Sequence, residues 1–476
     1  MGQEIEGGDF SAEDREEFRN RLRRETATLK QWFDERAFDE DDVPTVGLEL
    51  EGWLTDTDCL PAPQNAEFIE TADDPDIVTE LSKFNFELNA PIRTLNKDVL
   101  FQTQNDLTLS WQKCERAGRP HDLSPVMIGI LPTVRNEMLK PDWMSDSERY
   151  RALNREVFRR RDHQPLHISI EGYDKLDYIA EDLMLEAACT SLQSHLKVNQ
   201  DDAVRLYNAG VIASAPLVAA TANSPFLFSK SLWDETRIPA FEQATSMDNF
   251  REPSGRNAQR VTLGTGYLKE SFLELFLLNM HYGDLLPALS DDGRKLPHLR
   301  LQNGTIWRWV RPILGFDGNL SPHLRIEHRV MPAGPSMVDT VANLALCHGL
   351  MLALADAETP PESETPFEDA RANFYACARH GLHADVRWAG KTVNVQVLLL
   401  EKLIPMACDA LKKAGVDAGD LNIYFNDILE DRLRNGQTGA AWQRSFVNCH
   451  GTNYQALTQR YVEMQRTGKP VHEWTI

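Results

Sequence analysis

Apolar and polar residues alternate along several short segments of the chain, and this two-residue period predicts β-strands. Residues 45–54 (TVGLELEGWL) show the alternation most clearly. The shorter strand candidates are residues 84–88, 126–131, 166–171, 305–313 and 323–330. The last two flank the turn-forming residues 316–319, so we expect them to pair.

Longer segments repeat apolar residues every three or four positions, which predicts helices. The expected helices are residues 11–38, 95–117, 147–160, 179–198, 201–222 and 337–355, with further helices after residue 369. Residues 241–266 are polar without a clear period and predict a loop. Strands separated by long helices, followed by a helical final third, predict an α+β fold.

The amino-acid composition argues against some classes of binding partner. The 476 residues include 72 acidic and 50 basic side chains, which give a formal net charge of −22. Such a balance argues against a nucleic-acid or anionic-membrane partner, because both bind clustered Lys and Arg. The first ten residues lack the basic and apolar regions of a signal peptide. The longest apolar runs, which begin at Val211 and Leu344, are shorter than a membrane span. These features predict a soluble, cytoplasmic protein.

Two carboxylates on the first strand are the most informative local feature. Glu49 and Glu51 are two residues apart, so their side chains project from the same face of the strand. Like charges at this spacing are unfavourable unless a cation neutralises them, and carboxylate oxygens suit Mg²⁺ or Mn²⁺. On its own, the pattern is more typical of an exposed strand face that Lys or Arg side chains neutralise.

Other expected strands also carry polar side chains in apolar surroundings. These side chains are Glu87, His167, Ser169, Glu327 and Arg329, and the last two share one face of their strand. Carboxylates, an imidazole and an arginine on one sheet surface favour ATP-dependent phosphoryl transfer, in which metals neutralise phosphates and arginine stabilises the transferring group. The chain has no Walker-A loop, no G-x-S-x-G elbow and no H-E-x-x-H motif.

Six segments, in order along the chain, resemble the glutamate–cysteine ligase type 2 family of carboxylate–amine ligases. They are VGLELEGW (46–53), FELNAPIRTL (86–95), SERYRALNREVF (147–158), ATANSPFLF (220–228), IEHRVMPAG (326–334) and FYACARHGL (374–382). The resemblance implies a glutamine-synthetase-like fold, in which helices cover the outer face of a curved, mainly antiparallel sheet. It also implies a catalytic domain over residues 1–355. Residues 356–368 are rich in Pro, Ser and Glu and predict an exposed linker or loop, and we expect the helical C-terminal region over 369–476 to pack on the catalytic domain.

The same resemblance implies ATP and Mg²⁺, with Mn²⁺ as an alternative, and a γ-glutamyl or related amide bond formed through an acyl phosphate. Glutamate and an amine such as cysteine are then the substrates, and a homodimer is compatible with the sequence. The implied metal ligands are Glu49, Glu51, Glu87, His167 and Glu327. Arg329 and Glu51 are the implied catalytic residues, and Arg237, Asn223 and Ser169 are the implied substrate-binding residues.

Two positions depart from the family pattern. The chain has His167-Ile168-Ser169 where the family has His-x-His or Gln-x-Asn, and Pro332 where bacterial relatives have Asp. The identity of the acceptor amine therefore stays open. Two other functions also stay open, a guanidino-type phosphotransferase on the same fold and a non-catalytic regulator that binds nucleotide or metal.

Overall fold

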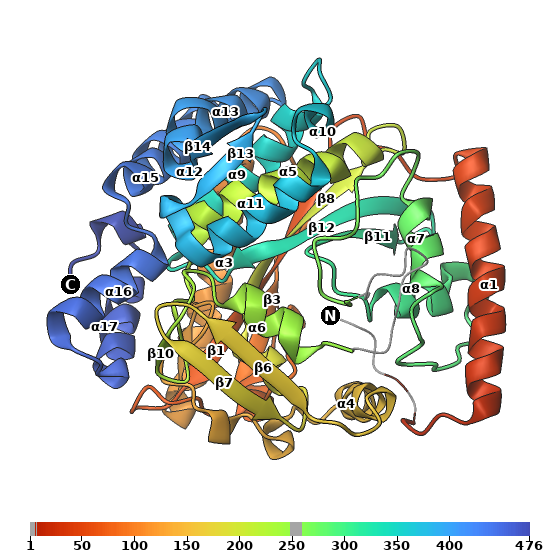
Figure 1. Ribbon diagram of the computed structural model, residues 1–476, viewed down its shortest axis with the longest axis horizontal. Helices are drawn as coiled ribbons and strands as arrows, with labels where there is room; N and C mark the ends of the chain where they lie inside the picture. The colour runs from red at the N-terminus through yellow and green to blue at the C-terminus, as the bar shows by residue number, and fades with distance from the viewer. Residues whose placement is uncertain (1–4, 6, 248–258) are drawn as a thin grey trace.

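The computed structural model describes residues 5, 7–247 and 259–476 (Figure 1). Its main strands are β1 (Thr45–Thr55), β2 (Ile77–Thr79), β3 (Asn85–Asn89), β4 (Arg93–Thr94), β5 (Ser124–Val126), β8 (Ser191–Val198), β11 (Val310–Phe316) and β12 (Pro322–Pro332). They form one curled sheet in the order β11-β12-β8-β1-β3-β2, with β4 and β5 also paired to β1. Every pairing within this sheet is antiparallel. The antiparallel curved sheet that the sequence predicted is therefore confirmed.

The two faces of the sheet differ because apolar and polar residues alternate along its strands. On β1, Leu48 and Leu50 join the hydrophobic core. Glu49 and Glu51 point to the opposite face, where they line a cavity. Strand β12 repeats the pattern, with Ile326 in the core. One face of the sheet is thus apolar and the other is strongly charged.

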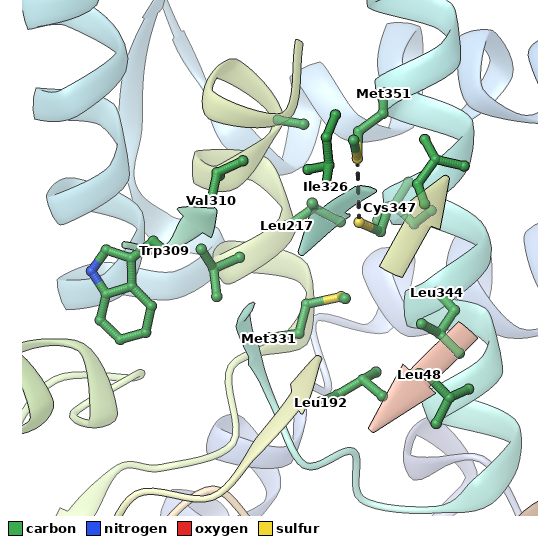
Figure 2. Close-up of a cluster of buried hydrophobic side chains, with 14 of the residues drawn as sticks. Leu48, Leu192, Leu217, Trp309, Val310, Ile326, Met331, Leu344, Cys347 and Met351 are labelled. Carbon is green, nitrogen blue, oxygen red and sulfur yellow. Dashed lines mark hydrogen bonds between the residues drawn. The ribbon is translucent and has the colours of Figure 1, made fainter. Parts of the chain in front are cut away.

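Two long apolar helices cover the apolar face. They are α5 (Ala203–Thr221) and α9 (Met337–Ala355), which pack against each other and against the sheet. Figure 2 shows Leu344 of α9 close to Leu48 of β1, with Leu217 of α5 drawn in the same cluster of buried side chains. Both helices are long and apolar enough to cross a membrane, but 89% and 78% of their most apolar windows are buried inside the protein. Their composition is that of core helices.

The remaining helices surround this core on several sides. In the N-terminal and middle parts they are α1 (Ala12–Glu35), α2 (Asn65–Ala72), α3 (Val99–Gly118), α4 (Glu148–Arg160), α6 (Arg237–Ala244), α7 (Leu273–Asn279) and α8 (Pro297–Asn303). Toward the C-terminus they are α10 (Pro361–Glu364), α11 (Phe367–His380), α12 (Val395–Leu398), α13 (Ile404–Lys413), α14 (Ala418–Leu421), α15 (Asp431–Asn435), α16 (Gly439–His450) and α17 (Tyr454–Arg466). Helix α11 packs on α5, and α13 packs on α9 (Figure 1).

The C-terminal helices belong to the same core as the sheet. One cluster of buried apolar residues extends from Phe18 to Leu433, across the predicted linker. Within residues 356–368, Pro361 and Thr365 are buried. Three small hairpins complete the described structure: β9 (Phe226–Leu227) with β10 (Lys230–Ser231), β13 (Asp385–Trp388) with β14 (Lys391–Asn394), and β6 (Leu166–Glu171) with β7 (Lys175–Ala180).

Several sequence predictions need correction. The expected helix over residues 179–198 is wrong, because these residues contain the end of β7 and all of β8, the central strand of the sheet. The strand expected at 166–171 exists as β6, but it pairs with β7 outside the main sheet. The loop expected over 241–266 begins with the last turn of α6, and its residues 248–258 lie outside the described part of the chain.

Candidate active site

A cavity of about 610 Å³ lies against the charged face of the sheet. Strands β1, β3, β8, β11 and β12 form one wall, and residues of α4, α6, α7 and α8 line the opposite side. The strand residues that line it alternate with core residues, so the two-residue period itself places the charged groups in the cavity. The cavity is large enough for a small-molecule ligand.

The strand register aligns the charged side chains across the sheet. Glu51 of β1 pairs with Glu87 of β3. Farther along, His195 of β8 pairs with Glu327 of β12, and Glu327 pairs with Arg311 of β11. Acidic side chains therefore lie near one edge of the wall and arginines near the other.

Five carboxyl groups gather at the acidic side. Burial, together with the negative charge of Glu80, raises the pKa of Glu51 to about 7. Burial and the charges of Glu49 and Glu80 raise the pKa of Glu87 well above its usual value. Burial likewise raises the pKa of Glu186 to about 8, with Glu80 and Glu51 adding to the effect. Buried carboxylates repel one another in this way when no cation is present, so the group would gain stability from a divalent ion.

Glu51 is held rigidly in the cavity wall. Its carboxylate accepts hydrogen bonds from the Ser191 backbone N–H at 2.6 Å and the Ser191 hydroxyl at 2.8 Å. The Gln193 side-chain amide donates a third hydrogen bond at 2.9 Å. These donors come from β8, so the central strand fixes the direction of a carboxylate on β1. Catalytic and metal sites require that the side chains which contact the ligand are held in fixed orientations.

An imidazole lies beside the other carboxylate of β1. His195 Nε2 is 3.2 Å from Glu49 Oε1. Burial raises the pKa of Glu49, but the charge of His195 and its hydrogen bond outweigh burial and hold that pKa well below the usual value. Glu49 is therefore a carboxylate, ready to bind a cation.

Two arginines share one glutamate at the basic side. Arg311 Nη2 donates to Glu327 Oε2 at 2.6 Å, and Arg329 Nη1 lies 3.3 Å from Glu327 Oε1. Burial raises the pKa of Glu327, but the charges of Arg311 and Arg329 lower it overall. The Arg329 guanidinium also lies over the Phe241 ring, 5.8 Å from its centroid. A positively charged fork thus faces the cavity from a fixed position.

The donor set fits a hard divalent cation. Carboxylate oxygens with one imidazole suit Mg²⁺ or Mn²⁺ when phosphate oxygens or waters supply the other ligands. Among the described residues, no three His, Cys, Asp or Glu side chains already converge as a complete metal site. His195 Nδ1 is enclosed and has no hydrogen-bond partner in the described structure, so this ring nitrogen is available to a ligand.

The structure brings five of the predicted site residues together. Glu49, Glu51, Glu87, Glu327 and Arg329 all line the cavity. Alternation along the strands was sufficient to find them, because residues two apart on a strand share a face.

His167 and Ser169 lie elsewhere, contrary to the expectation that they stand beside the carboxylates. Both are exposed on β6, in the separate hairpin with β7. The Ser169 hydroxyl donates to Asp177 Oδ1 at 2.9 Å. The polar-x-polar pair of the central strand is instead Gln193 and His195 of β8, both of which line the cavity. Residues 167–169 are therefore not on the central strand of the sheet.

Arg237 and Asn223 are also outside the cavity lining. Arg237 is buried, where it pairs with Glu235 at 3.2 Å and donates to the Val330 carbonyl at 2.6 Å. Asn223 is fully buried and donates to the carbonyl of Ala333 at 2.9 Å. The polar groups of both side chains are bonded to neighbouring protein atoms rather than directed into the cavity.

The prediction also missed several cavity residues. They are Glu80, Arg149, Tyr150, Glu186, Gln193, His195, Arg300, Arg311 and Arg325. Gln193 and His195 carried a detectable signal, because polar residues two apart share one face of a strand. Glu80 lies in a loop and Glu186 begins a single 3-10 turn, and neither segment is long enough for a period to indicate which side chains meet.

Comparison with known proteins identifies the family of the chain. The model of glutamate–cysteine ligase family 2 matches residues 45–466, which include the whole sheet. The chain belongs to this family. Membership supports a carboxylate–amine ligase and confirms the resemblance found in the sequence. No individually curated protein sequence matches the chain.

Two solved structures show the same fold. Glutamate–cysteine ligase from Francisella tularensis, solved in complex with AMP, has a TM-score of 0.53 at 13% identity and covers 90% of both chains. A bifunctional glutathione synthetase from Pasteurella multocida has the same TM-score and identity, and covers 93% of this chain and 54% of its own. The chain thus spans about half the length of the second protein. At this identity the likeness concerns the fold, which is glutamine-synthetase-like.

Proposed function

We propose that this protein is an ATP- and Mg²⁺-dependent ligase that joins the side-chain carboxylate of glutamate, or a related carboxylate, to an amine. The observation that carries the proposal is the pairing of two kinds of group on one cavity wall. Carboxylates on β1, β3 and β12 suit divalent cations, and Arg329 presents a fixed guanidinium beside them. Phosphoryl transfer needs this combination, because charge builds up on the transferring group.

The proposed reaction has two steps. A carboxylate oxygen of the first substrate attacks the γ-phosphorus of ATP, and ADP leaves with the electron pair of the broken P–O bond. The amine nitrogen of the second substrate then attacks the acyl carbon, phosphate leaves, and the amine loses a proton to solvent. Bound metal ions would supply neutralisation of the phosphate charges during the first step.

The residues of the chain contribute orientation and charge. Glu49, Glu51, Glu87 and Glu327 would hold the cations, and His195 is placed to assist beside Glu49. Ser191 and Gln193 keep Glu51 in place through their hydrogen bonds. Arg329 would stabilise the transferring phosphoryl group, while Arg311 keeps Glu327 neutralised from the other side. The −22 net charge is consistent with small-molecule substrates in the cytoplasm.

Phosphate release tests this proposal. Purified protein is incubated with Mg-ATP and glutamate, with and without cysteine and then with a panel of other amines. Phosphate that requires both glutamate and one amine, with the amide product detected by mass spectrometry, supports a ligase and names the acceptor. Slow release with glutamate alone supports an acyl phosphate that water hydrolyses.

Two results would favour the alternatives. A phosphorylated amine formed without inorganic phosphate indicates a guanidino-type phosphotransferase. ATP binding without turnover for any pair of substrates indicates a non-catalytic regulator. Glu327→Gln is the matched inactive control, because it keeps the shape of the side chain and removes the charge between Arg311 and Arg329.

A further inference from the structure

Two arginines of the cavity have no acidic partner. Arg325 and Arg300 both line it, and neither side chain makes a hydrogen bond or ion pair with any residue in the described part of the chain. The Nε atom of Arg325 is completely enclosed. The neighbouring cations differ, because Arg311 is paired with Glu327 and Lys197 is paired with Asp39 at 2.6 Å.

The fold places these two arginines together. Arg325 lies on β12, opposite Ile313 of β11 and Lys197 of β8. Arg300 belongs to α8, where its guanidinium lies over the Phe316 ring, 5.6 Å from the centroid. Because Arg300 is exposed and also lines the cavity, it lies at the cavity's opening.

The electrostatic situation of the pair is unfavourable as it stands. Burial and the charge of Arg325 lower the pKa of Arg300. Two guanidinium groups without acidic partners that line the same cavity repel each other, and a bound anion would offset that repulsion. A guanidinium matches the two oxygens of a carboxylate or phosphate.

We infer that Arg325 and Arg300 form an anion subsite, at the side of the cavity away from Glu51 and Glu87, that binds an oxyanion of one substrate. The inference rests on the proposed ligase function and deepens it. The oxyanion is either a phosphate of the nucleotide or a carboxylate of the acceptor amine. Arg237, which the sequence suggested for a substrate carboxylate, is occupied by Glu235 and Val330.

Binding measurements test the subsite without requiring turnover. Arg325→Gln and Arg300→Gln are compared with Arg294→Gln, an exposed arginine that does not line the cavity and lies 3.7 Å from Asp292. Calorimetry gives the Kd of Mg-ATP. With ADP and glutamate present, it also gives the Kd of matched amines that differ by one carboxylate, such as cysteine and cysteamine.

The two sources of the oxyanion give different results. If the Kd of Mg-ATP rises by about tenfold or more in both cavity variants, the subsite binds a phosphate of the nucleotide, since one charged hydrogen bond contributes about that factor to affinity. If both variants instead bind cysteine about tenfold more weakly and bind cysteamine as the wild type does, the subsite binds the carboxylate of the acceptor amine. If neither ligand weakens beyond the Arg294→Gln control, the inference is overturned.

Folding of the variants is checked in the same experiment. We expect Arg325→Gln to have a Tm equal to or above that of the wild type without ligand, because it removes an unpaired charge. The increase in Tm on ligand binding should be smaller. A large fall in the ligand-free Tm would mean that Arg325 supports the fold, and would contradict the subsite. An inactive protein that still shows these binding losses would refute the proposed function and leave the subsite standing.

Discussion

Replacing Arg329 by lysine separates its proposed role in phosphoryl transfer from any role in folding. In the wild type, Arg329 Nη1 lies 3.3 Å from Glu327 Oε1, and the guanidinium lies over Phe241. Lysine keeps the positive charge but has one ammonium group, so it cannot reach both Glu327 and a transferring phosphoryl group. Glu327 keeps its 2.6 Å hydrogen bond from Arg311 in either protein. We therefore expect little loss of stability.

The expected loss is in turnover. Removing one donor from a developing charge costs about 2.7 kcal/mol or more, which lowers kcat by about 100-fold. The KM values for ATP and glutamate should change by less than about threefold, because the interaction strengthens in the transition state. Steady-state phosphate release measures both quantities.

A matched control excludes a general effect of the substitution. Arg379 lies over the Trp233 ring at 5.8 Å, the same distance as Arg329 over Phe241, and it is exposed outside the cavity lining. Arg379→Lys should retain wild-type kcat. If Arg329→Lys also retains kcat within about threefold, then Arg329 does not stabilise the transferring group.

Three further predictions follow from buried and exposed groups. Arg237→Ala should lower the free energy of unfolding in urea by about 3–5 kcal/mol, since it leaves buried Glu235 without its cation; a raised KM for glutamate at unchanged stability would restore a substrate role. Burial lowers the pKa of His348 to about 3, so the unfolded chain binds a proton below pH 6.5 that the folded protein does not. Stability should therefore fall as pH drops from about 6.5 toward 3, and His348→Gln should lose about 2 kcal/mol less than wild type between pH 7 and 5; equal slopes would show that His348 is not neutral in the fold. His167→Ala should change neither phosphate release nor unfolding, because the side chain is exposed outside the main sheet; a tenfold loss of activity would place it back in the reaction.

Most of the site residues that could be predicted followed from the two-residue period of the strands. Glu49 and Glu51 face the cavity because β1 alternates, and the same rule applies to Glu327 and Arg329 on β12. The rule needs only local information, since the direction of a side chain on a strand follows from its position. It does not need to know which strands are neighbours.

The central strand β8 shows where local information fails. Leu192 and Leu196 are four residues apart, a spacing that places two apolar residues on one face of a helix and also on one face of a strand. Only pairing with β1 and β12 decides between them. His167 was assigned to the main sheet for the same reason: its strand was predicted correctly, but the sequence does not show which strand pairs with it. Arg237 was assigned to a substrate because the sequence does not reveal that Glu235 folds against it.

The order of the strands has a consequence for synthesis of the chain. Glu49, Glu51 and Glu87 are made first, whereas Arg311 and Arg329 lie on β11 and β12, which end only at Pro332. A growing chain that has not yet released these strands from the ribosome therefore presents an acidic sheet face without the arginines of β11 and β12. Strand pairing between segments so distant in sequence is slow because it closes large loops. Newly made protein thus depends on its last sheet strand for charge balance, and shortened chains that stop before that strand would expose both this acidic face and the apolar surface that α9 covers.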